Sequence, residues 1–284
     1  MAAFVPRSEL ADIEALAVEL ATLAGQEITS ALGGILKVRY KGSGAEAEMW
    51  RDPVSEVDQR VEEMIRDRLA ERFPDHGIIG EEFDAHEAGG DGFVWAVDPV
   101  DGTTNFVNGF PLCAASIGVL WQGHPVVGAI WCGSSQSLRP GVYHASADSP
   151  LRFDGEEIVV KANPAVRRRL AGVPVAIPGR GGWETRKTGS AALECAFVAA
   201  GILEAARFET PNIWDVAAGI ALLDAAGAVV LTEQDESWLP FEGFAETDAA
   251  DPFASLRTWR KSLMIGRVDS DALTSGFEVL AEAE

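Results

Sequence analysis

The spacing of apolar residues predicts two long amphipathic helices near the beginning of the chain. Apolar residues recur every three or four positions over residues 9–32 and again over residues 54–73. In the second segment, "EVDQRVEEMIRDRLAERF", charged residues occupy the opposite face. Each helix would therefore have one apolar face that can pack on a sheet.

Short apolar runs that follow these helices predict the sheet. They are rich in β-forming residues and are separated by glycine or proline, which favour turns. The runs are "HGIIGEE", "GFVWAVD", "CAASIGVLW", "PVVGAIWCG" and "GVYHASA". Because most connections have the size of hairpin loops, we expect a largely antiparallel sheet covered by the two helices.

After about residue 150, predicted strands and helices alternate, which is typical of α/β folds. Strands are expected at residues 172–177, 202–208, 228–232 and 262–266, and helices at residues 190–201, 212–227 and 269–284. The acidic, aromatic and proline-containing residues 233–257 are expected to form an ordered surface loop. We therefore predict an α+β half at residues 1–150 and an α/β half at residues 151–284, which share a core.

The composition is that of a globular protein with an acidic surface. A chain of 284 residues that is 47% hydrophobic can bury a full core. Its 44 acidic and 23 basic residues give a formal charge of −21, which opposes binding to nucleic acid or anionic membranes and is compatible with divalent cations. No apolar run reaches about 18 residues, and acids interrupt the N-terminal apolar pattern. We expect a cytoplasmic protein.

The three cysteines, Cys113, Cys132 and Cys195, lie far apart in apolar runs. They form no metal-binding or redox motif, because none is paired at a C-x-x-C spacing or placed near a histidine at metal spacing. We expect buried, reduced thiols.

The stretch "WAVDPVDGTTNF", residues 95–106, places two aspartates directly after an apolar strand. Asp98 precedes Pro99, which disfavours helical conformation and keeps the chain extended to the end of the strand. Gly102 permits a sharp turn that would bring Asp101 back beside Asp98. Two carboxylates held close repel each other unless cations lie between them, so the stretch predicts a metal site.

The residues after this turn are typical of a helix start. Thr103, Thr104 and Asn105 are residue types that cap helices, and a helix N-terminus attracts anions, so metals and a phosphate would share one pocket. The alternative is an Asx turn that caps a helix. That alternative explains Asp101 to Thr104 but leaves Asp98 without a role.

Further acidic residues are expected at the same edge. The "GEE" at residues 80–82 ends a predicted strand, which places at least one glutamate near Asp98. Asp215 in "NIWDVAAG" begins a predicted helix, where capping the helix and binding a metal are both consistent with its position. The stretch "DPVSEVD" adds Asp52, Ser55 and Asp58 at the start of the second helix, which taken alone is most simply an acidic cluster at a helix N-terminus.

Together, these motifs resemble the inositol monophosphatase family of magnesium-dependent, lithium-sensitive phosphatases. The resemblance runs from about Asp52 to Val230 and is carried by "DPVDGTTNF" and "WDVAAG". It implies a layered αβαβα sandwich of the inositol monophosphatase/fructose-1,6-bisphosphatase type, which combines α+β and α/β parts. It also implies a metal-assisted phosphomonoesterase with Mg²⁺ as cofactor, about two to three ions per site.

The resemblance also implies roles for particular residues. The metal ligands would be Glu81, Asp98, the backbone carbonyl of Val100, Asp101 and Asp215. Thr103 would help to orient the attacking water with Asp58 as its supporting carboxylate, and Glu81 and Asp101 would also serve catalysis. Substrate contacts would come from Val100, Asp101, Gly102, Thr103, Gly189, Ser190, Ala191, Glu209 and Asp215. Taken alone, the "GSA" at residues 189–191 is better explained as an ordinary helix start.

The sequence departs from the family pattern at two places. Relatives usually have a lysine a few residues before the segment that begins at Asp52, whereas residues 44–50 read "GAEAEMW" and only Arg51 adjoins Asp52. Relatives also place a substrate-binding glutamate seven residues before the aspartate of Trp-Asp. Here Phe208 occupies that position, and Glu209 lies six residues before Asp215. Either the loop is one residue shorter and Glu209 keeps the role, or the inositol contact is lost.

We expect hydrolysis of inositol monophosphate, or of a similar polyol or sugar phosphate, by metal-activated water. This chemistry needs no protein nucleophile. The alternatives are phosphatases of the same superfamily that act on histidinol phosphate, fructose 1,6-bisphosphate or 3′-phosphonucleotides, and a non-catalytic regulatory relative. Family resemblance and tryptophan-rich strands predict a homodimer. The expected ligand is a small phosphomonoester substrate, and no nucleic-acid or membrane partner is expected.

Overall fold

The amphipathic segment that opens the chain forms one continuous helix, α1 (Arg7–Ala31), as predicted. The structure is a computed structural model that describes residues 7–40, 53–86, 92–161, 163–175, 182–244 and 252–281. Along α1 the side chains of Ile13, Leu16, Leu20 and Ile28 are buried, at spacings of three, four and eight residues. One apolar face therefore holds the helix against the protein.

The second predicted helix begins two residues later than expected. Pro53–Ser55 form strand β2, which pairs antiparallel with β1 (Val38–Tyr40). Helix α3 (Glu56–Arg72) then begins with a capping box, in which the Ser55 hydroxyl accepts a hydrogen bond from Val57 N–H and the Asp58 carboxylate accepts one from Ser55 N–H. The exchange satisfies backbone donors that a helix start leaves unpaired, which fixes the start at Glu56.

The predicted apolar runs form a seven-stranded sheet in the order β3-β4-β5-β6-β7-β8-β9. Only β3 and β4 pair in parallel, and the other neighbours are antiparallel, in agreement with the prediction. The strands are β3 (Gly77–Gly80), β4 (Phe93–Asp101), β5 (Ala114–Trp121), β6 (His124–Cys132), β7 (Gly141–Ser146), β8 (Arg152–Phe153) and β9 (Glu156–Glu157).

Alternation along β4 gives this sheet two buried faces. Phe93 and Trp95 pack into the cluster formed with α1 and α3. Val94 and Ala96 pack on the other side, into the cluster formed with α5 (Ala191–Ala199) and α6 (Ile213–Ala225). Because successive side chains point to opposite faces, residue parity decides which layer each position of β4 meets.

The second sheet is mixed and has the order β11-β10-β12-β15-β13-β14. Its strands are β10 (Arg169–Gly172), β11 (Trp183–Arg186), β12 (Ala205–Phe208), β13 (Val229–Gln234), β14 (Ser237–Pro240) and β15 (Leu263–Gly266). The predicted strands at residues 202–208, 228–232 and 262–266 correspond to β12, β13 and β15. The predicted helices at residues 190–201, 212–227 and 269–284 correspond to α5, α6 and α8 (Ser270–Ala281).

Two predictions in this half were wrong. The strand expected at residues 172–177 ends at Gly172, because Pro174 cannot donate a ladder hydrogen bond, and β10 lies instead at Arg169–Gly172 between β11 and β12. Residues 233–257 are not all loop, since β14 pairs with β13 and helix α7 spans Pro252–Thr258. Residues 176–177 and 245–251 of these two predictions lie outside the described residues. The short, partly polar β11 escaped prediction altogether.

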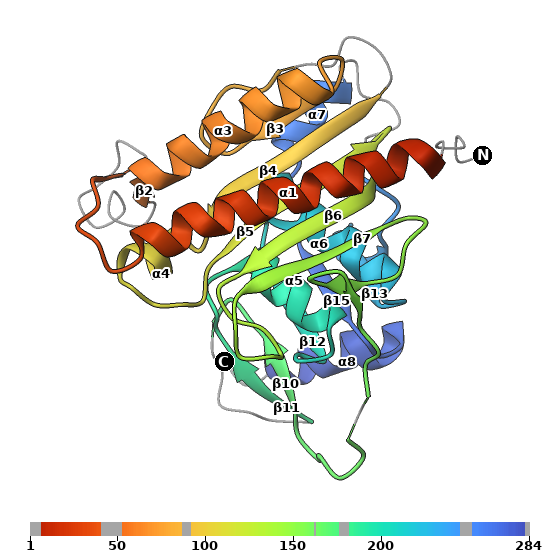
Figure 1. Ribbon diagram of the computed structural model, residues 1–284. Helices are drawn as coiled ribbons and strands as arrows, with labels where there is room; N and C mark the ends of the chain where they lie inside the picture. Colours follow the sequence, from red (N-terminus) through yellow and green to blue (C-terminus); the bar gives the residue numbers. More distant parts are fainter. Residues whose placement is uncertain are drawn as a thin grey trace.

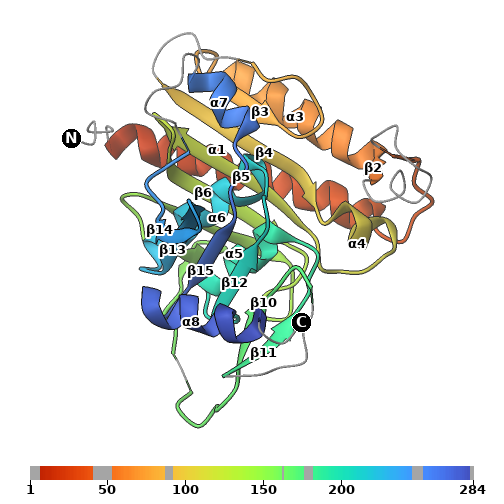
Figure 2. The same ribbon diagram turned by 180° about the vertical axis from the view of Figure 1, so that it is seen from behind.

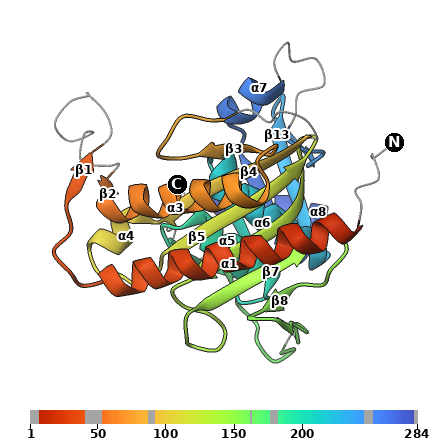
Figure 3. The same ribbon diagram turned by 45° about the horizontal axis from the view of Figure 1, so that its top comes forward.

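The elements stack in five layers (Figures 1 and 2). Helices α1 and α3 lie side by side on one face of the first sheet, as Figure 3 shows, and α5 and α6 lie between the two sheets. Helix α8 covers the outer face of the second sheet, where Leu273, Phe277 and Leu280 are buried. This αβαβα arrangement confirms the predicted fold class. Within the described residues, no helix has both the length and the apolar character needed to cross a bilayer.

Helix α6 crosses strand β5 so closely at Gly118 that a larger side chain does not fit there. A methyl group added at Gly118 of β5 would lie 2.6 Å from the backbone nitrogen of Ala218 and 2.9 Å from the side chain of Ala217. Both alanines belong to α6, so small residues on both elements let the helix backbone approach the strand.

We expect Gly118→Ala to lower the free energy of unfolding by about 1–3 kcal/mol, the usual cost of overpacking a core. The measurement is the urea midpoint of the purified variant. Gly182→Ala is the matched control, since no atom lies within 4 Å of its added methyl group. Equal midpoints for the two variants would contradict the tight crossing.

Candidate active site

Strand β4 delivers Asp98 to the middle layer. Asp98 has the same parity as Val94 and Ala96, so its side chain lies on the face covered by α5 and α6. The strand does not end at Asp98 as expected, because pairing with β5 continues to Asp101 across an irregularity between the two aspartates. This irregularity displaces Asp101 from the strict alternation of the strand.

The turn that joins the two aspartates is stabilised by Asp98 itself. Its Oδ1 accepts a hydrogen bond of 3.0 Å from Val100 N–H, which is an Asx turn. The Asx turn that the sequence offered as the alternative for Asp101 to Thr104 is thus formed by Asp98. Gly102 follows at φ 85°, a left-handed conformation that glycine adopts without strain.

Helix α4 (Thr103–Val107) begins directly after this turn. Thr103, Thr104 and Asn105 lie inside the helix and do not cap it, because the cap position is Gly102, which has no side chain. Asn105 instead donates to the carbonyls of Leu112 (2.6 Å) and Thr188 (2.7 Å). It thereby ties the turn to the loop before α5.

Thr103 and Asp58 are brought together, although 45 residues separate them. The Thr103 hydroxyl lies 3.0 Å from Asp58 Oδ1 and 2.9 Å from the Val100 carbonyl, and its single proton can serve one of them at a time. Asp58 is fully buried, and its other oxygen, Oδ2, accepts from Ser55 in the capping box of α3. One carboxylate thus caps a helix and holds the threonine.

Asp101 is held by the start of α5. Its Oδ2 accepts hydrogen bonds from the Ser190 hydroxyl (2.7 Å) and from Ala192 N–H (2.5 Å). The same Ser190 oxygen accepts from Leu193 N–H and caps the helix. The helix-start interpretation of residues 189–191 is therefore correct for Ser190, and this side chain also bonds to Asp101.

Asp215 lies in the first turn of α6 and completes a second capping box. Its Oδ2 accepts from the backbone N–H (2.7 Å) and the side-chain amide (3.0 Å) of Asn212. The Ser116 hydroxyl of β5 donates to the Trp214 carbonyl over 3.0 Å, which fastens this helix start to the first sheet. Of the two roles weighed for Asp215, the capping role is present in the structure.

Burial and mutual repulsion raise the pKa values of these aspartates. Desolvation is the largest cause for all three, followed by the charge of Glu81 for Asp98 and that of Asp101 for Asp215. The pKa of Asp98 lies well above its usual range, that of Asp215 rises to about 8, and that of Asp101 rises to about 7 despite the bonds from Ser190 and Ala192. The fold therefore concentrates carboxyl groups where negative charge is costly.

The donor chemistry of this cluster fits a hard divalent cation, which prefers carboxylate and carbonyl oxygens. Within the described ranges, no three His, Cys, Asp or Glu side chains converge closely enough to enclose an ion as they stand. Each aspartate directs one oxygen to protein donors, and burial and the charge of Glu81 raise the pKa of Asp98. Positive charge at this place would relieve the repulsion among the carboxylates.

The residue that holds the Glu81 segment was not predicted. Glu62 on α3 is fully buried and accepts from Glu82 N–H (2.8 Å) and Phe83 N–H (3.3 Å), while Arg66 donates to it over 2.7 Å. Gly80 packs against the Glu62 carboxyl group, which leaves no space for a side chain there. In the sequence Glu62 looks like one more charged residue of an amphipathic helix. Its spacing of four residues from Arg66 is the only signal of a pair, and its burial is visible only in the structure.

A cavity of about 230 Å³ adjoins the cluster and contains several of the predicted substrate contacts. It is lined by Gly189, Ser190, Ala191, Glu209 and Asp215, together with Lys187, Glu194 and Arg207, which the motifs did not indicate. The buried Glu194 accepts from the Thr188 hydroxyl (2.7 Å), and desolvation raises its pKa to about 7. The loop therefore brings the exposed Glu209 to the same cavity as Asp215.

The loop after β12 is tightly turned. Thr210, which follows Glu209, has φ 48°, a left-handed conformation that is uncommon for a β-branched residue. That the loop is one residue shorter than the family spacing stays a prediction. Asp52, Arg51 and residues 44–50, where the family lysine was expected, lie outside the described residues.

The sequence as a whole matches one family. The model of the inositol monophosphatase family matches residues 9–250. The chain belongs to this family. It is therefore a phosphatase of the inositol monophosphatase type, in a family whose phosphatases are metal-dependent.

Named relatives agree. The chain is 32% identical over 238 residues to "Fructose-1,6-bisphosphatase/inositol-1-monophosphatase" of Aquifex aeolicus, which covers 78% of this chain and 83% of that protein. It is 31% identical over 238 residues to "Inositol monophosphatase 1" of Sus scrofa, which covers 75% of this chain and 81% of that protein. The solved extragenic suppressor protein suhB of Bartonella henselae has a TM-score of 0.72 at 25% identity, over 96% of this chain and 100% of that chain.

The raised pKa values predict how stability depends on pH without metal. Folding raises the pKa values of Asp98, Asp101 and Asp215, so their protonation stabilises the fold fully below the unfolded value of about 4. That contribution is lost as the pH rises through about 7 for Asp101 and about 8 for Asp215. In EDTA, we expect Tm to fall between pH 5 and pH 8, by about 2–4 °C for each kcal/mol lost.

Asp98→Asn should flatten this fall and raise Tm at pH 8 in EDTA, because it removes one repelling charge from the buried cluster. Asp67→Asn, an exposed position on α3, is the matched control and should follow the parent. A Tm of Asp98→Asn in EDTA well below the parent value at pH 8 would show that the carboxylate stabilises the fold.

Proposed function

We propose that this phosphatase is magnesium-dependent and hydrolyses inositol monophosphate or a similar polyol or sugar phosphate. The observation that carries the proposal is the meeting of the Asp98, Asp101 and Asp215 segments beside a cavity that Glu209 also lines. The likeness to relatives that are named for inositol monophosphate supports the substrate class.

The ion ligands in this proposal are Glu81, Asp98, the Val100 carbonyl, Asp101 and Asp215. Bound Mg²⁺, about two to three ions per site, supplies charge neutralisation for the phosphate and for the departing alkoxide. The chain's own part is to hold the carboxylates in place. One oxygen of each aspartate accepts hydrogen bonds from the protein, from Val100, from Ser190 and Ala192, and from Asn212. The orientation of each carboxylate is therefore set before substrate binds.

Thr103 is proposed to orient the attacking water. When its hydroxyl donates to Asp58, which Ser55 holds in place, the lone pairs of the threonine oxygen point away from Asp58 and can accept from water. Pre-set orientation of this kind lowers the barrier without binding the substrate more tightly.

The polyol part of the substrate is proposed to lie against Gly189, Ser190, Ala191 and Glu209. The Ser190 hydroxyl already donates to Asp101, and its backbone N–H donates to the Thr188 hydroxyl. The phosphate side of the same substrate would be met by Val100, Asp101, Gly102, Thr103 and Asp215.

A second candidate substrate is fructose 1,6-bisphosphate. Two basic residues, Lys187 and Arg207, line the cavity that Glu209 also lines, and a second phosphate would find positive charge there. The relative from Aquifex aeolicus carries both activities in its name.

The homodimer, the cytoplasmic location, lithium sensitivity and the division of the chain at residue 150 stay predictions.

Phosphate release from a panel of phosphomonoesters, with Mg²⁺ and with excess EDTA, tests the proposed function. We expect turnover of inositol 1-phosphate only with Mg²⁺, and turnover lower by orders of magnitude in Asp98→Asn. Histidinol phosphate, fructose 1,6-bisphosphate and a 3′-phosphonucleotide complete the panel. Full activity in EDTA, or no hydrolysis of any member, would reject it.

Thr103→Ala should lower kcat by about 10²- to 10³-fold and leave KM nearly unchanged, because the hydroxyl acts mainly in the transition state. Thr104→Ala is the matched control, since this neighbour on α4 is exposed. Steady-state kinetics separate the two parameters. A large rise in KM at constant kcat would assign Thr103 to substrate binding.

Glu209→Ala should weaken discrimination between inositol 1-phosphate and an aryl phosphate by about 1–3 kcal/mol, because its carboxylate would accept hydrogen bonds from a polyol hydroxyl. The ratio of kcat/KM for the two substrates measures this, with the exposed Glu233→Ala as control. An unchanged ratio in Glu209→Ala would show that the shortened loop no longer reads the substrate.

A further inference from the structure

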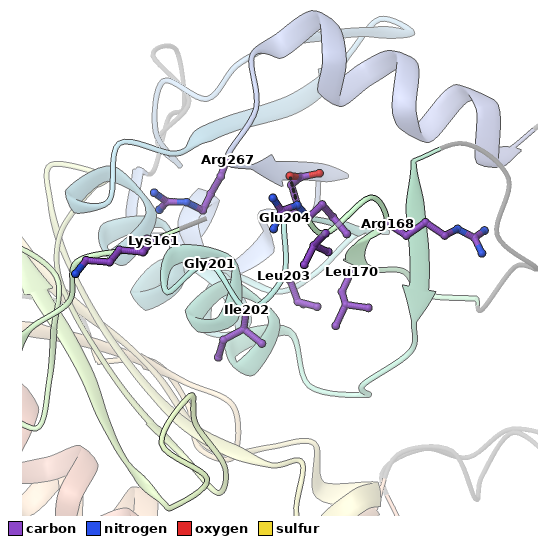
Figure 4. Close-up of a pocket in the computed structure, with 11 residues that line it drawn as sticks. Lys161, Arg168, Leu170, Gly201, Ile202, Leu203, Glu204 and Arg267 are labelled. Carbon is purple, nitrogen blue, oxygen red and sulfur yellow. Dashed lines mark ion pairs between the residues drawn. The ribbon is translucent and has the colours of Figure 1, made fainter. Parts of the chain in front are cut away.

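A second and larger cavity, of about 450 Å³, lies away from the carboxylate cluster. Figure 4 shows it between the segment at Lys161, strand β10, the turn from α5 to β12, and Arg267 after β15. Helix α5 separates the two regions. Ser190, which holds Asp101, caps its first turn, whereas the turn at Gly201 follows its last residue.

The charge around this cavity is opposite to that of the protein. Of the 23 basic residues in a chain of formal charge −21, four border the cavity, and Glu204 is the only acid among its lining residues. The basic residues are Lys161, Arg168, Arg169 and Arg267. A cluster of this sign on so acidic a chain favours an anionic ligand.

The four basic side chains differ in whether a carboxylate of the protein pairs with them. Arg168 extends away from the cavity in Figure 4 and pairs with Glu184 at 2.9 Å. Arg169 lies 3.7 Å from Glu204, whose carboxylate also accepts from Trp183 Nε1. Within the described part of the chain, Lys161 and Arg267 form no ion pair with a carboxylate. Arg267 and Lys161 extend on the same side of the cavity (Figure 4).

The backbone fixes the walls. Arg267 N–H donates to the Glu204 carbonyl over 2.9 Å, and Glu204 N–H donates to the Leu170 carbonyl over 2.8 Å. The Arg267 guanidinium donates to the carbonyl of Ala199, the last residue of α5, over 3.0 Å, which leaves its other N–H groups for a ligand. Gly201 has φ 74°, and Val160 packs so closely on it that an added side chain would collide.

The remaining lining is apolar. Leu170, Ile202 and Leu203 border the cavity between the charged groups, and Ile202 and Leu170 are partly accessible. An inorganic ion would leave this surface in contact with water, whereas an organic group attached to the ion would cover it.

We propose that this cavity binds a small organic phosphate, with Lys161 and Arg267 contacting the phosphate and the apolar residues contacting the organic part. An arginine fork and a lysine ammonium together supply the directed donors and the point charge that a phosphate dianion requires. This site is separate from the proposed catalytic pocket and does not depend on the proposed function.

Binding of phenyl phosphate measured by titration calorimetry in excess EDTA tests the proposal. Without metal, the carboxylate cluster repels phosphate, and a loss of binding in the Lys161 and Arg267 variants assigns the binding to this cavity and not to Lys187 and Arg207. We expect saturable binding that is tighter for phenyl phosphate than for inorganic phosphate, and about tenfold weaker in Lys161→Gln and in Arg267→Gln, as for a lost charge-assisted hydrogen bond. Lys161→Glu should weaken it further by repulsion.

Arg60→Gln and Arg68→Gln, on the exposed face of α3, are the matched controls and should bind as the parent does. Thermal melts establish that each variant is folded, and the exposed Lys161 keeps the test valid if Arg267→Gln unfolds. No binding by the parent, equal affinity for inorganic phosphate, or equal losses in the controls would each overturn the proposal.

Discussion

Repulsion among buried carboxyl groups is the constraint around which the site is arranged. Asp98 and Asp101 are almost inaccessible to solvent, and Glu81 and Asp215 act on them through the same poorly solvated region. Such an arrangement costs stability unless each carboxylate has donors of its own. The fold supplies them from turns and helix starts. An Asx turn serves Asp98, the start of α5 serves Asp101, and a capping box serves Asp215.

These donors and the neighbouring polar contacts also connect the first sheet to the middle layer. Asp101 belongs to the first sheet and its donors to α5, while Asn105 on α4 donates to Thr188 and Ser116 on β5 donates to Trp214. Helices α5 and α6 are packed between the sheets by apolar side chains, and these polar contacts set the direction of their first turns. The apolar core thus places the middle layer, and the polar contacts determine where its helix starts lie relative to β4.

The sequence predicted the elements whose pattern is local and strong. The periodicity of α1, α3, α5 and α6 and the apolar runs of β4 to β7 were sufficient, and the motif around Asp98 located the carboxylates. Strand β10 was misplaced because "GVPVAI" has strand composition, whereas the paired residues Arg169–Gly172 have none and are held by β11 and β12. Glu62, Glu194 and the basic cavity were missed because their roles depend on partners that are distant in sequence. The role of Asp58 was the opposite case, since the family motif indicated it before its contact with Thr103 was known.

The contact between Asp101 and the start of α5 has a consequence for the synthesis of the protein. It joins residues that are 89 and 91 positions apart, and Asp215 emerges from the ribosome later still. A nascent chain that ends before α5 exposes Asp101 without the Ser190 and Ala192 donors that orient it. A cation held by the proposed ligands would meet the complete set only after residue 215 has been translated, so its capture would come late in synthesis.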